Sequence, residues 1–510
     1  MLELFAAEET ALTLHTPLDA LIAEYRKKCE DIKRISAYVA GETDVMGYFM
    51  EGARVEHNVG NYSATSLFQV DPAIRALDAF FWSRAMQLTD CLELMPADKR
   101  NEWNEQIRKH QTPPFEPDTV RATLESMISQ RAAFFSERVD GIFRALSEVH
   151  LTNQPQGFSK RMIISWVIGG YGSINHGRAN YIHDLRCVIA RFMGRDEPRS
   201  NMTYTDLDRI VRCGAYGQWH LFDGGSLRIR VYKVGTAHLE VHPDMAYRLN
   251  QVLAYKNPSA IPSEFRRKPA KPKKEHVLVR DLVPFEVLAA LGNGRLDTTG
   301  QRLSFYEKLP AAAVEVLNYI GGVAESGYAW AFDYHAEGVL YELQRTGIMP
   351  EKRSHQYYPT TEKLARIAVE LAEPQDDDEF LEPEAGQGGI ADHLPAERLT
   401  CVEISALHCA VLKAKGYKTV CADFLSWNPG RTFSKAVMNP PFSDGRALDH
   451  VQHAASLVRP GGRVVAILPA SMRGKTLIDG WEHTWSEVYQ GEFKGTGVAV
   501  AIVRLDSLNQ

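Results

Sequence analysis

The last third of this 510-residue chain is predicted to fold as an α/β domain with an open, mostly parallel sheet, preceded by a mainly helical α+β region. Three observations predict this. Beyond residue 353, short apolar runs alternate with amphipathic segments, which is typical of strand–helix units. Four of those runs end in glycine or polar residues, as expected where ligands meet the carboxyl edge of a sheet. Upstream, long stretches carry apolar residues at helical spacing.

The chain is too long for a single hydrophobic core, so several domains are expected. We divide it at changes in composition and periodicity. The expected segments are a helical region (1–157), a basic α+β domain (158–265), a basic Pro/Lys linker (266–280), a helical connector (281–352) and the α/β domain (353–510).

Composition excludes several protein classes. Hydrophobic and charged contents of 45% and 24% are globular values. Seven cysteines, an odd number without a C-x-x-C pair, argue against a disulfide framework and against a zinc site. No apolar run approaches the roughly 20 residues of a membrane span. Residues 1–16 lack a basic stretch typical of secretory signals, so we expect a cytoplasmic protein. From the cysteine pattern and the short apolar runs we expect that it needs no metal and contacts no membrane.

The sequence of the helical region shows no recognisable group of catalytic or ligand-binding residues. Leu18–Ile35 and Pro117–Val149 both place apolar residues three and four positions apart, which predicts amphipathic helices that bury one face. Pro113 and Pro114 break the pattern before the second stretch.

The basic domain contains a predicted hairpin. Two apolar runs flank Asp223-Gly224-Gly225, and the second alternates with Arg228 and Arg230. We expect a small antiparallel sheet that carries Arg228, Arg230 and Lys233 on one face. Three histidines nearby, at 220, 238 and 242, suggest a metal site. Their spacing fits no standard ligand pattern, so we interpret them as surface or core residues.

Charge is unevenly distributed. The net charge is −6, yet residues 158–280 contain 21 Lys and Arg against 10 Asp and Glu. A basic block in an acidic protein indicates a polyanionic partner; the alternative is a solvated face followed by a basic linker. The linker begins with Arg266, Arg267 and Lys268, which can follow a nucleic-acid backbone.

The α/β domain places candidate ligand-binding residues at four successive strand ends. Phe380–Leu381 leads to Glu382 and to a glycine turn around Ala385, Gly386 and Gly388, after which a helix is expected. The next strand ends in Glu403 and Ile404, about 20 residues further on, where nucleotide-binding folds hold ribose hydroxyls. A third strand ends in Asp423 and Phe424.

The fourth strand delivers Asn439-Pro440-Pro441-Phe442. Two prolines fix the backbone and remove two donors, so the loop presents an amide, a carbonyl and an aromatic ring in a rigid arrangement. Two acceptors and a stacking surface suit a planar base with an exocyclic amine. An ordinary proline-rich turn with a core phenylalanine is the alternative for the tetrapeptide alone.

With these residues, segment 353–510 resembles class I S-adenosylmethionine-dependent methyltransferases of the DNA N6-adenine type. The resemblance implies a Rossmann-like, mostly parallel seven-stranded sheet ending in an antiparallel hairpin near 490–493 and 498–505. It implies that Asn439, Pro440, Pro441 and Phe442 are catalytic. The cofactor-binding residues that it implies are Tyr357, Tyr358, Pro359, Thr360, Glu382, Ala385, Gly386, Gly388, Glu403, Ile404, Asp423 and Phe424.

The resemblance also implies the partners. The cofactor is S-adenosylmethionine and the substrate double-stranded DNA, with a flipped adenine methylated on its exocyclic amine. Residues 219–250 resemble, more loosely, a domain of unknown function that accompanies such methyltransferases in phage and mobile elements. That setting places the protein in a host cytoplasm or at the nucleoid, with anti-restriction or restriction–modification among the roles. A separate target-recognition domain is not expected after the catalytic segment, so any sequence reading falls to residues 1–350.

Three alternatives remain. Ribosomal RNA guanine-N2 methyltransferases can also carry Asn-Pro-Pro-Phe, but they usually have a second methyltransferase-like fold, and no second glycine loop occurs here. Protein glutamine methyltransferases favour Tyr after the prolines. A DNA-binding or anti-restriction module with an inactive fold would not need Gly386, Glu403, Asp423 and Asn439 together. The sequence specifies neither a target site nor an oligomeric state.

Overall fold

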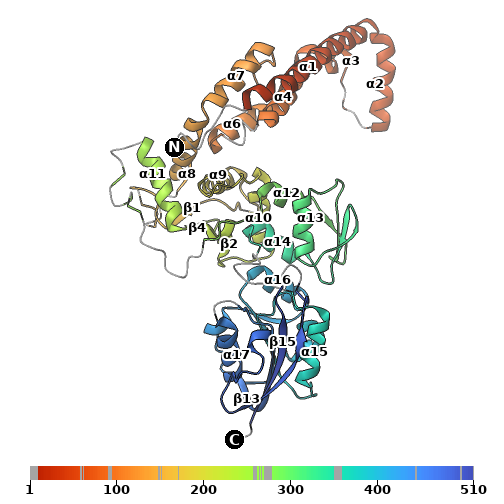
Figure 1. Ribbon diagram of the computed structural model, residues 1–510. Coiled ribbons are helices and arrows are strands. Elements are labelled where there is room, and N and C mark those ends of the chain that lie inside the picture. Colours follow the sequence, from red (N-terminus) through yellow and green to blue (C-terminus); the bar gives the residue numbers. More distant parts are fainter. Residues whose placement is uncertain are drawn as a thin grey trace. The chain divides into compact units, whose positions relative to one another are not determined.

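The computed structural model describes residues 10–57, 60, 62–89, 95–146, 150, 152–154, 156–170, 172–256, 261–262, 265, 267–268, 278–349, 359–442, 445–493 and 497–508 (Figure 1). The chain divides into two compact units. One comprises Met1–His220 with Ser226–Leu278, and the other comprises Leu221–Gly225 with Val279–Gln510. The division near residue 278 falls within the segment interpreted as a basic linker.

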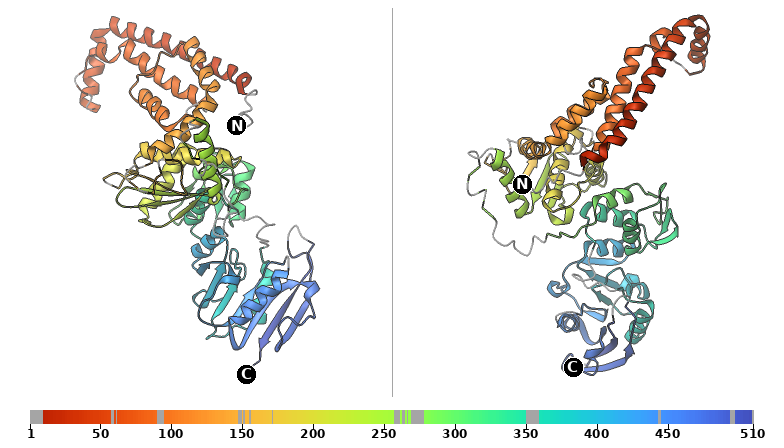
Figure 2. Two further views of the ribbon diagram at one scale, coloured as in Figure 1. Left: turned by 90° about the vertical axis from the view of Figure 1, so that its left-hand side faces the viewer. Right: turned by 45° about the horizontal axis from the view of Figure 1, so that its top comes forward.

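The first unit begins with helices. They are α1 (Thr10–Gly41), α2 (Thr43–His57), α3 (Ala64–Leu67), α4 (Val70–Thr89), α6 (Ala97–Arg108), α7 (Pro117–Ser129) and α8 (Arg131–Ala145). α1 packs along α4, as two views show (Figure 2). Aromatic rings of Phe81, Trp82 and Phe115 form the centre of the core between these helices. The stripe that predicted one helix over Pro117–Val149 is shared by α7 and α8, which are separated at Gln130.

A four-stranded sheet follows in the order β1-β4-β3-β2. Its strands are β1 (Arg161–Ile164), β2 (His220–Phe222), β3 (Leu227–Val231) and β4 (Ala237–Val241), with helices α9 (His176–Phe192), α10 (Ser200–Arg212) and α11 (Pro243–Lys256). The predicted turn at Asp223–Gly225 is a 3-10 turn between β2 and β3. Along β3, Leu227, Ile229 and Val231 are buried while Arg228 and Arg230 are half-buried, so the predicted alternation holds.

The second unit begins with a small α+β segment. It contains α12 (Phe285–Gly292), β5 (Arg295–Leu296), β6 (Arg302–Ser304), α13 (Ala311–Tyr319), β7 (Val323–Ser326), β8 (Ala329–Ala331) and α14 (Glu337–Thr346). The strands form an antiparallel sheet in the order β5-β6-β8-β7. Interpreting 281–352 as a helical connector was therefore incomplete. Strands of two to four residues are too short to give a period-two pattern.

The rest of this unit is built on a seven-stranded sheet in the order β11-β10-β9-β12-β13-β15-β14. The strands are β9 (Phe380–Pro383), β10 (Leu399–Glu403), β11 (Lys418–Cys421), β12 (Phe433–Met438), β13 (Val458–Pro469), β14 (Trp481–Tyr489) and β15 (Val500–Ser507). The first five run parallel, and β15 pairs antiparallel with both β13 and β14. This Rossmann-like order reverses direction between β9 and β12.

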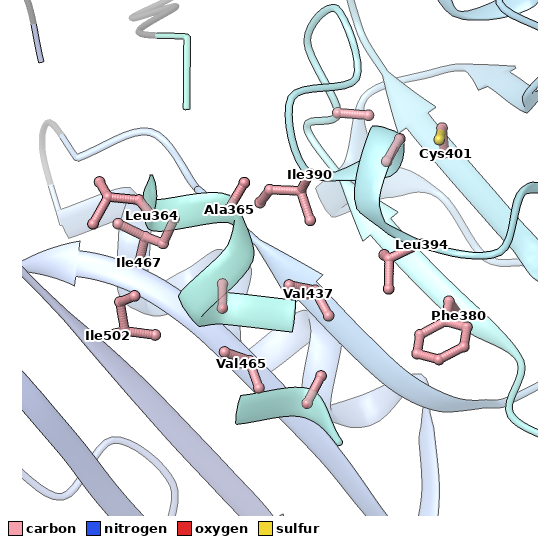
Figure 3. Close-up of a cluster of buried hydrophobic side chains, with 14 of the residues drawn as sticks. Leu364, Ala365, Phe380, Ile390, Leu394, Cys401, Val437, Val465, Ile467 and Ile502 are labelled. Carbon is pink, nitrogen blue, oxygen red and sulfur yellow. The ribbon is translucent and has the colours of Figure 1, made fainter. Parts of the chain in front are cut away.

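Side chains alternate between the two faces of this sheet and create two cores. One face packs against α15 (Glu362–Ala372) and contains Phe380, Val437 and Ile502 (Figure 3). The other face packs against α17 (Arg446–Ser456) and contains Met438 and Val464. Helix α16 (Ala406–Ala414) covers β10 and β11. Because both faces of the sheet are covered at its centre, residues 464–468 of β13 form a continuous apolar run in the sequence.

Two expectations for this domain were wrong in detail. The hairpin strand expected near 490–493 is instead β14, Trp481–Tyr489, which lies at one edge of the sheet and is half-exposed along its length. The helix expected after the glycine turn is only a 3-10 turn, Ala391–His393. At the opposite edge, β11 is also partly exposed. Among the described helices, none combines the length and apolar character that crossing a membrane requires.

Candidate functional site

A cavity of about 600 Å³ lies at the carboxyl ends of β9, β10, β11 and β12. Four successive strands of a parallel sheet end at one edge, so residues far apart in sequence are brought together. The predicted residues that line it are Pro359, Thr360, Glu382, Ala385, Gly386, Glu403, Ile404, Asp423, Phe424, Asn439, Pro440, Pro441 and Phe442.

The glycine turn and the end of β10 are joined by hydrogen bonds. The backbone N–H of Gly386 donates to Glu403 Oε2 at 2.8 Å, and the N–H of Ser405 donates to Oε1 at 2.8 Å. Gly386 has a φ of +56°, which a side chain would strain. Each carboxylate oxygen of Glu403 therefore has a backbone donor on one side, and the carboxylate is held rigidly at the cavity wall.

Gly388 does not line the cavity. Its φ is +90°, and a side chain there would meet Leu412 and Tyr417 at 3.3–3.4 Å, so this glycine permits packing against α16. Its neighbour Gly389 does line the cavity and lies against Thr360. Tyr357 and Tyr358 fall outside the described residues.

Glu382 is a buried acid in the cavity wall. Its side chain is 2% exposed, and its Oε2 has no hydrogen-bond partner among the residues that the structure describes. Burial raises the pKa of Glu382 well above its ordinary value, with Asp392 and Glu403 adding to the shift. The backbone N–H groups of Ile390 and Ala391 oppose it. A buried carboxylate oxygen without a donor suits a cationic or donor group of a ligand.

The third strand end supplies both polar and apolar groups. Asp423 is exposed, and its Oδ1 accepts a hydrogen bond from the N–H of Leu425 at 3.2 Å. The ring of Phe424 lines the cavity but is only 3% exposed and packs edge-on against His453 in the core. Ile404 and Leu425, exposed by 59% and 40%, supply accessible apolar surface at the cavity.

The fourth strand end places Asn439 against the start of the domain. Its Nδ2 donates to Thr360 Oγ1 at 3.1 Å, which turns the nitrogen end of the amide toward Thr360. Thr361, the next residue, caps α15 and contacts Glu492. Pro440 is buried, while Pro441 and Phe442 are half-buried. The Phe442 ring meets Phe493 edge-on, with centroids 6.3 Å apart.

Sequence reasoning missed several lining residues. Glu384 Oε1 accepts a hydrogen bond from Nδ1 of His450, and both side chains line the cavity. These residues are 66 positions apart, and no motif links them. The other missed residues are Gln387, Gly389, Asp392, Val402, His408, Lys415, Ala422, Leu425 and Arg446.

The small α+β segment is attached directly to the cavity wall. Gln387 Nε2 donates to the Tyr319 carbonyl oxygen at 2.7 Å, and the Tyr319 hydroxyl lies 3.1 Å from His408 Nε2. Lys415 Nζ forms ion pairs with Asp333 at 3.0 Å and with Asp392 at 2.9 Å. Residues 279–349 therefore support the glycine turn and α16.

The predicted basic residues belong to the other unit. Arg230 lies over the rings of Trp219 and Tyr232 at 4.4 and 5.2 Å, and Lys233 lies 5.5 Å from the Tyr216 ring. Arg228 pairs across the sheet with Glu240, which also contacts Lys160. The face is thus aromatic as well as basic.

In the linker, Arg267 and Lys268 are exposed, and Arg266 lies outside the described residues. The three histidines considered for a metal site have other contacts: His220 with the Ala215 carbonyl, His238 with the Tyr232 ring, and His242 with the Asp244 N–H. Within the described ranges, no three His, Cys, Asp or Glu side chains form a group suited to a metal.

A family model described as a domain of unknown function (DUF4942) matches residues 74–259. This range contains residues 219–250, the segment whose resemblance to such a domain was noted in the sequence. No curated protein matches the chain.

Among solved structures, TrmN from Thermus thermophilus is 16% identical with a TM-score of 0.25, over 36% of this chain and 57% of its own. A putative RNA methyltransferase from Pyrococcus horikoshii is 19% identical with a TM-score of 0.26, over 31% and 89%. The M protein of the type I restriction enzyme EcoKI is 16% identical with a TM-score of 0.26, over 33% and 50%. The chain therefore spans little more than half the length of two of these three structures. TM-scores this low assign neither a family nor a function to this chain.

Proposed function

We propose that residues 359–508 bind S-adenosylmethionine and transfer its methyl group to the exocyclic amine of an adenine in DNA. The observation that carries the proposal is the position of Asn439. Its amide, held by Thr360, lines the same cavity as Glu403 and Asp423. An amide suited to a planar amine and two acids suited to a nucleoside thus share one space.

The residues present fit the cofactor. About 600 Å³ lies within the usual range for small-molecule sites. Glu403, fixed by two backbone N–H groups, can accept hydrogen bonds from ribose hydroxyls. Asp423 can accept from the adenine amine, with Ile404 and Leu425 covering the ring. The buried Glu382 matches the ammonium of the methionine portion.

Residues of the Asn-Pro-Pro-Phe loop would act on the substrate. The adenine amine is a weak nucleophile because its lone pair is delocalised into the ring. Asn439 Oδ1 and the Pro440 carbonyl can accept its two N–H bonds, which favours a tetrahedral nitrogen and localises the lone pair. Phe442 can stack on a flipped base, and such stacking is worth about 1–3 kcal/mol. The cofactor supplies an electrophilic methyl group on a sulfonium. The chain's contribution is alignment of the two reactants.

Arg228, Arg230, Lys233, Arg267 and Lys268 support a nucleic-acid substrate, as does Arg266 from the sequence. Arginine and lysine beside half-buried aromatic rings suit phosphates and unstacked bases. Double-stranded DNA is the partner that we propose, with the target adenine flipped out of the duplex.

The test is incubation of purified protein with labelled S-adenosylmethionine and either unmethylated duplex DNA or ribosomal RNA, followed by nucleoside mass spectrometry. We expect N6-methyladenine in DNA from the wild type. Asn439→Ala should abolish transfer while cofactor binding by calorimetry persists. Asn318→Ala, at an exposed asparagine in the same unit, is the matched control and should behave as wild type.

Other results would redirect the assignment. Label in RNA guanine alone would favour a guanine-N2 methyltransferase. Cofactor binding without label in either nucleic acid would favour a protein substrate or an inactive module. Full turnover by Asn439→Ala would contradict the proposed role of the loop.

A further inference from the structure

Glu384 occupies an unusual backbone position at the end of β9. Its φ is +52°, in the left-handed region that normally favours glycine. The side chain reaches α17, where Oε1 accepts a hydrogen bond from Nδ1 of His450. His450 is 7% exposed, and its ring packs against Phe424. A strained residue whose side chain is held by a buried histidine has one defined orientation.

The second oxygen of Glu384 is left without a donor. Oε2 is buried and has no hydrogen-bond partner within the described part of the chain. Burial raises the pKa of Glu384, and repulsion from Glu403 and Asp423 adds to the shift, whereas His450 opposes it. The carboxyl group therefore lies near the two acids proposed to bind the nucleoside, and it lines the same cavity.

Hydrogen-bond capacity around a ribose points to a role for this oxygen. A ribose presents two neighbouring hydroxyl donors. Each oxygen of Glu403 already accepts a backbone N–H, from Gly386 or from Ser405. Glu384 is a second acid nearby, and its Oε2 could accept a hydrogen bond from the second hydroxyl. This contact would be favourable because it would give a buried polar atom a hydrogen-bond partner.

We propose that Glu384, oriented by His450, accepts through Oε2 a hydrogen bond from one ribose hydroxyl of the bound nucleoside, beside Glu403. This inference rests on the proposed cofactor binding and assigns a second ribose-binding acid. His450 is a positioning residue, because it acts only through Glu384.

The experiment measures binding of S-adenosylhomocysteine and three analogues to the full chain by calorimetry. The analogues lack the 2′-hydroxyl, the 3′-hydroxyl or the adenine amine. We expect Glu384→Gln to weaken binding of the parent ligand by about 10- to 100-fold, as for loss of a hydrogen bond to a charged group. The loss should disappear for one deoxy analogue and persist for the others, because the mutation and the analogue remove the same contact.

Two further variants separate contact from structure. Glu384→Gly suits the positive φ, so it should fold at least as stably and still lose affinity for the parent ligand. His450→Ala should reduce the same hydroxyl-specific coupling. His450→Asn, whose amide N–H can replace Nδ1–H, should restore part of it. Glu397→Gln, at a side chain that is 73% exposed, is the matched control and should leave all four affinities unchanged.

Several binding results would contradict the proposed role of Glu384. Equal losses for all four ligands, or a coupling with the adenine amine alone, would overturn the ribose contact. Unchanged affinity in both Glu384 variants, with wild-type binding intact, would overturn this inference and leave the proposed function standing. Failure of the wild type to bind either S-adenosylmethionine or S-adenosylhomocysteine would overturn both.

Discussion

Asn439 Nδ2 donates to Thr360 Oγ1 across 3.1 Å, which joins the loop after β12 to the residue that precedes the N-cap of α15. The two residues are 79 positions apart. Thr360 was expected to contact the cofactor, and its observed partner is the proposed catalytic amide. The hydroxyl therefore fixes which end of the amide faces the rest of the cavity.

Replacing this hydroxyl should impair turnover more than binding. Thr360→Val keeps the shape of the side chain but removes the acceptor, so the Asn439 amide loses its orientation. We expect kcat to fall about 5- to 10-fold, equivalent to one hydrogen bond, with little change in cofactor Kd. Steady-state kinetics alongside calorimetry checks this. Thr360→Ser, which keeps the hydroxyl, should retain most activity, and equal kcat values for the two variants would contradict the prediction.

Buried Glu382 should lower the free energy of unfolding of the protein while it contributes to cofactor binding. Because burial raises the pKa of Glu382, the folded state holds its proton at pH values where the unfolded state has lost it. The free energy of unfolding must then fall as the pH rises through that interval. Glu382→Gln should remove this dependence and raise the free energy of unfolding at neutral pH by about 1–3 kcal/mol, while cofactor affinity falls.

Urea denaturation at about pH 5 and about pH 8 measures this dependence. Glu397→Gln, at an exposed carboxylate, serves as control. A Glu382→Gln protein less stable than wild type at neutral pH would show that the ionised acid is compensated by contacts other than those described.

The segment before the α/β domain should contribute to its stability through Tyr319. Tyr319→Phe removes the hydroxyl that lies 3.1 Å from His408, at an expected cost of about 1 kcal/mol in the free energy of unfolding. Tyr319→Ala also removes the ring beside His408 and should cost about 3 kcal/mol. Tyr328→Phe, at an exposed ring in the same segment, should change stability by less than about 0.5 kcal/mol. Equal effects at the two tyrosines would argue against a supporting role.

The basic face should contribute to DNA affinity through phosphate contacts. Lys233→Ala removes an exposed charge and should lower the slope of log K against log salt by about 1, equally for different sequences. Arg230→Ala should weaken binding further, because its guanidinium also orders the Trp219 and Tyr232 rings. Fluorescence anisotropy over a salt series measures both. Lys308→Ala, at an exposed lysine in the other unit, is the comparison, and the same slope in all three variants would contradict the assignment.

The central sheet was predictable because its strands are buried on both faces. Val437 and Val465 belong to the uninterrupted apolar runs 436–438 and 464–468, and the first of these leads directly to Asn439. Edge strand β14 was misplaced for the opposite reason. It mixes Glu, His, Thr and Ser with Trp and Tyr on a half-exposed surface, so its composition does not mark a buried strand.

Within the site, residues carried by local motifs were found and residues joined only in space were not. Glu403 and Asn439 each follow an apolar run at a spacing that predicts their place. Glu384 and His450 meet because the sheet reverses direction between β9 and β12, and neither residue alone has a distinguishing neighbour. The contact of Tyr319 with His408 likewise depends on packing between segments 89 residues apart.

The two outermost strands of the large sheet have a consequence for handling the protein. Lys418 on β11 and the acidic pair Glu482 and Glu487 on β14 place charges along both open rims. A second copy that paired the same edge, β11 with β11 or β14 with β14, would bring like charges together and remove part of their hydration. We expect concentrated preparations to resist aggregation through pairing of identical edges, and neutralising these three side chains should lower the concentration at which the protein precipitates.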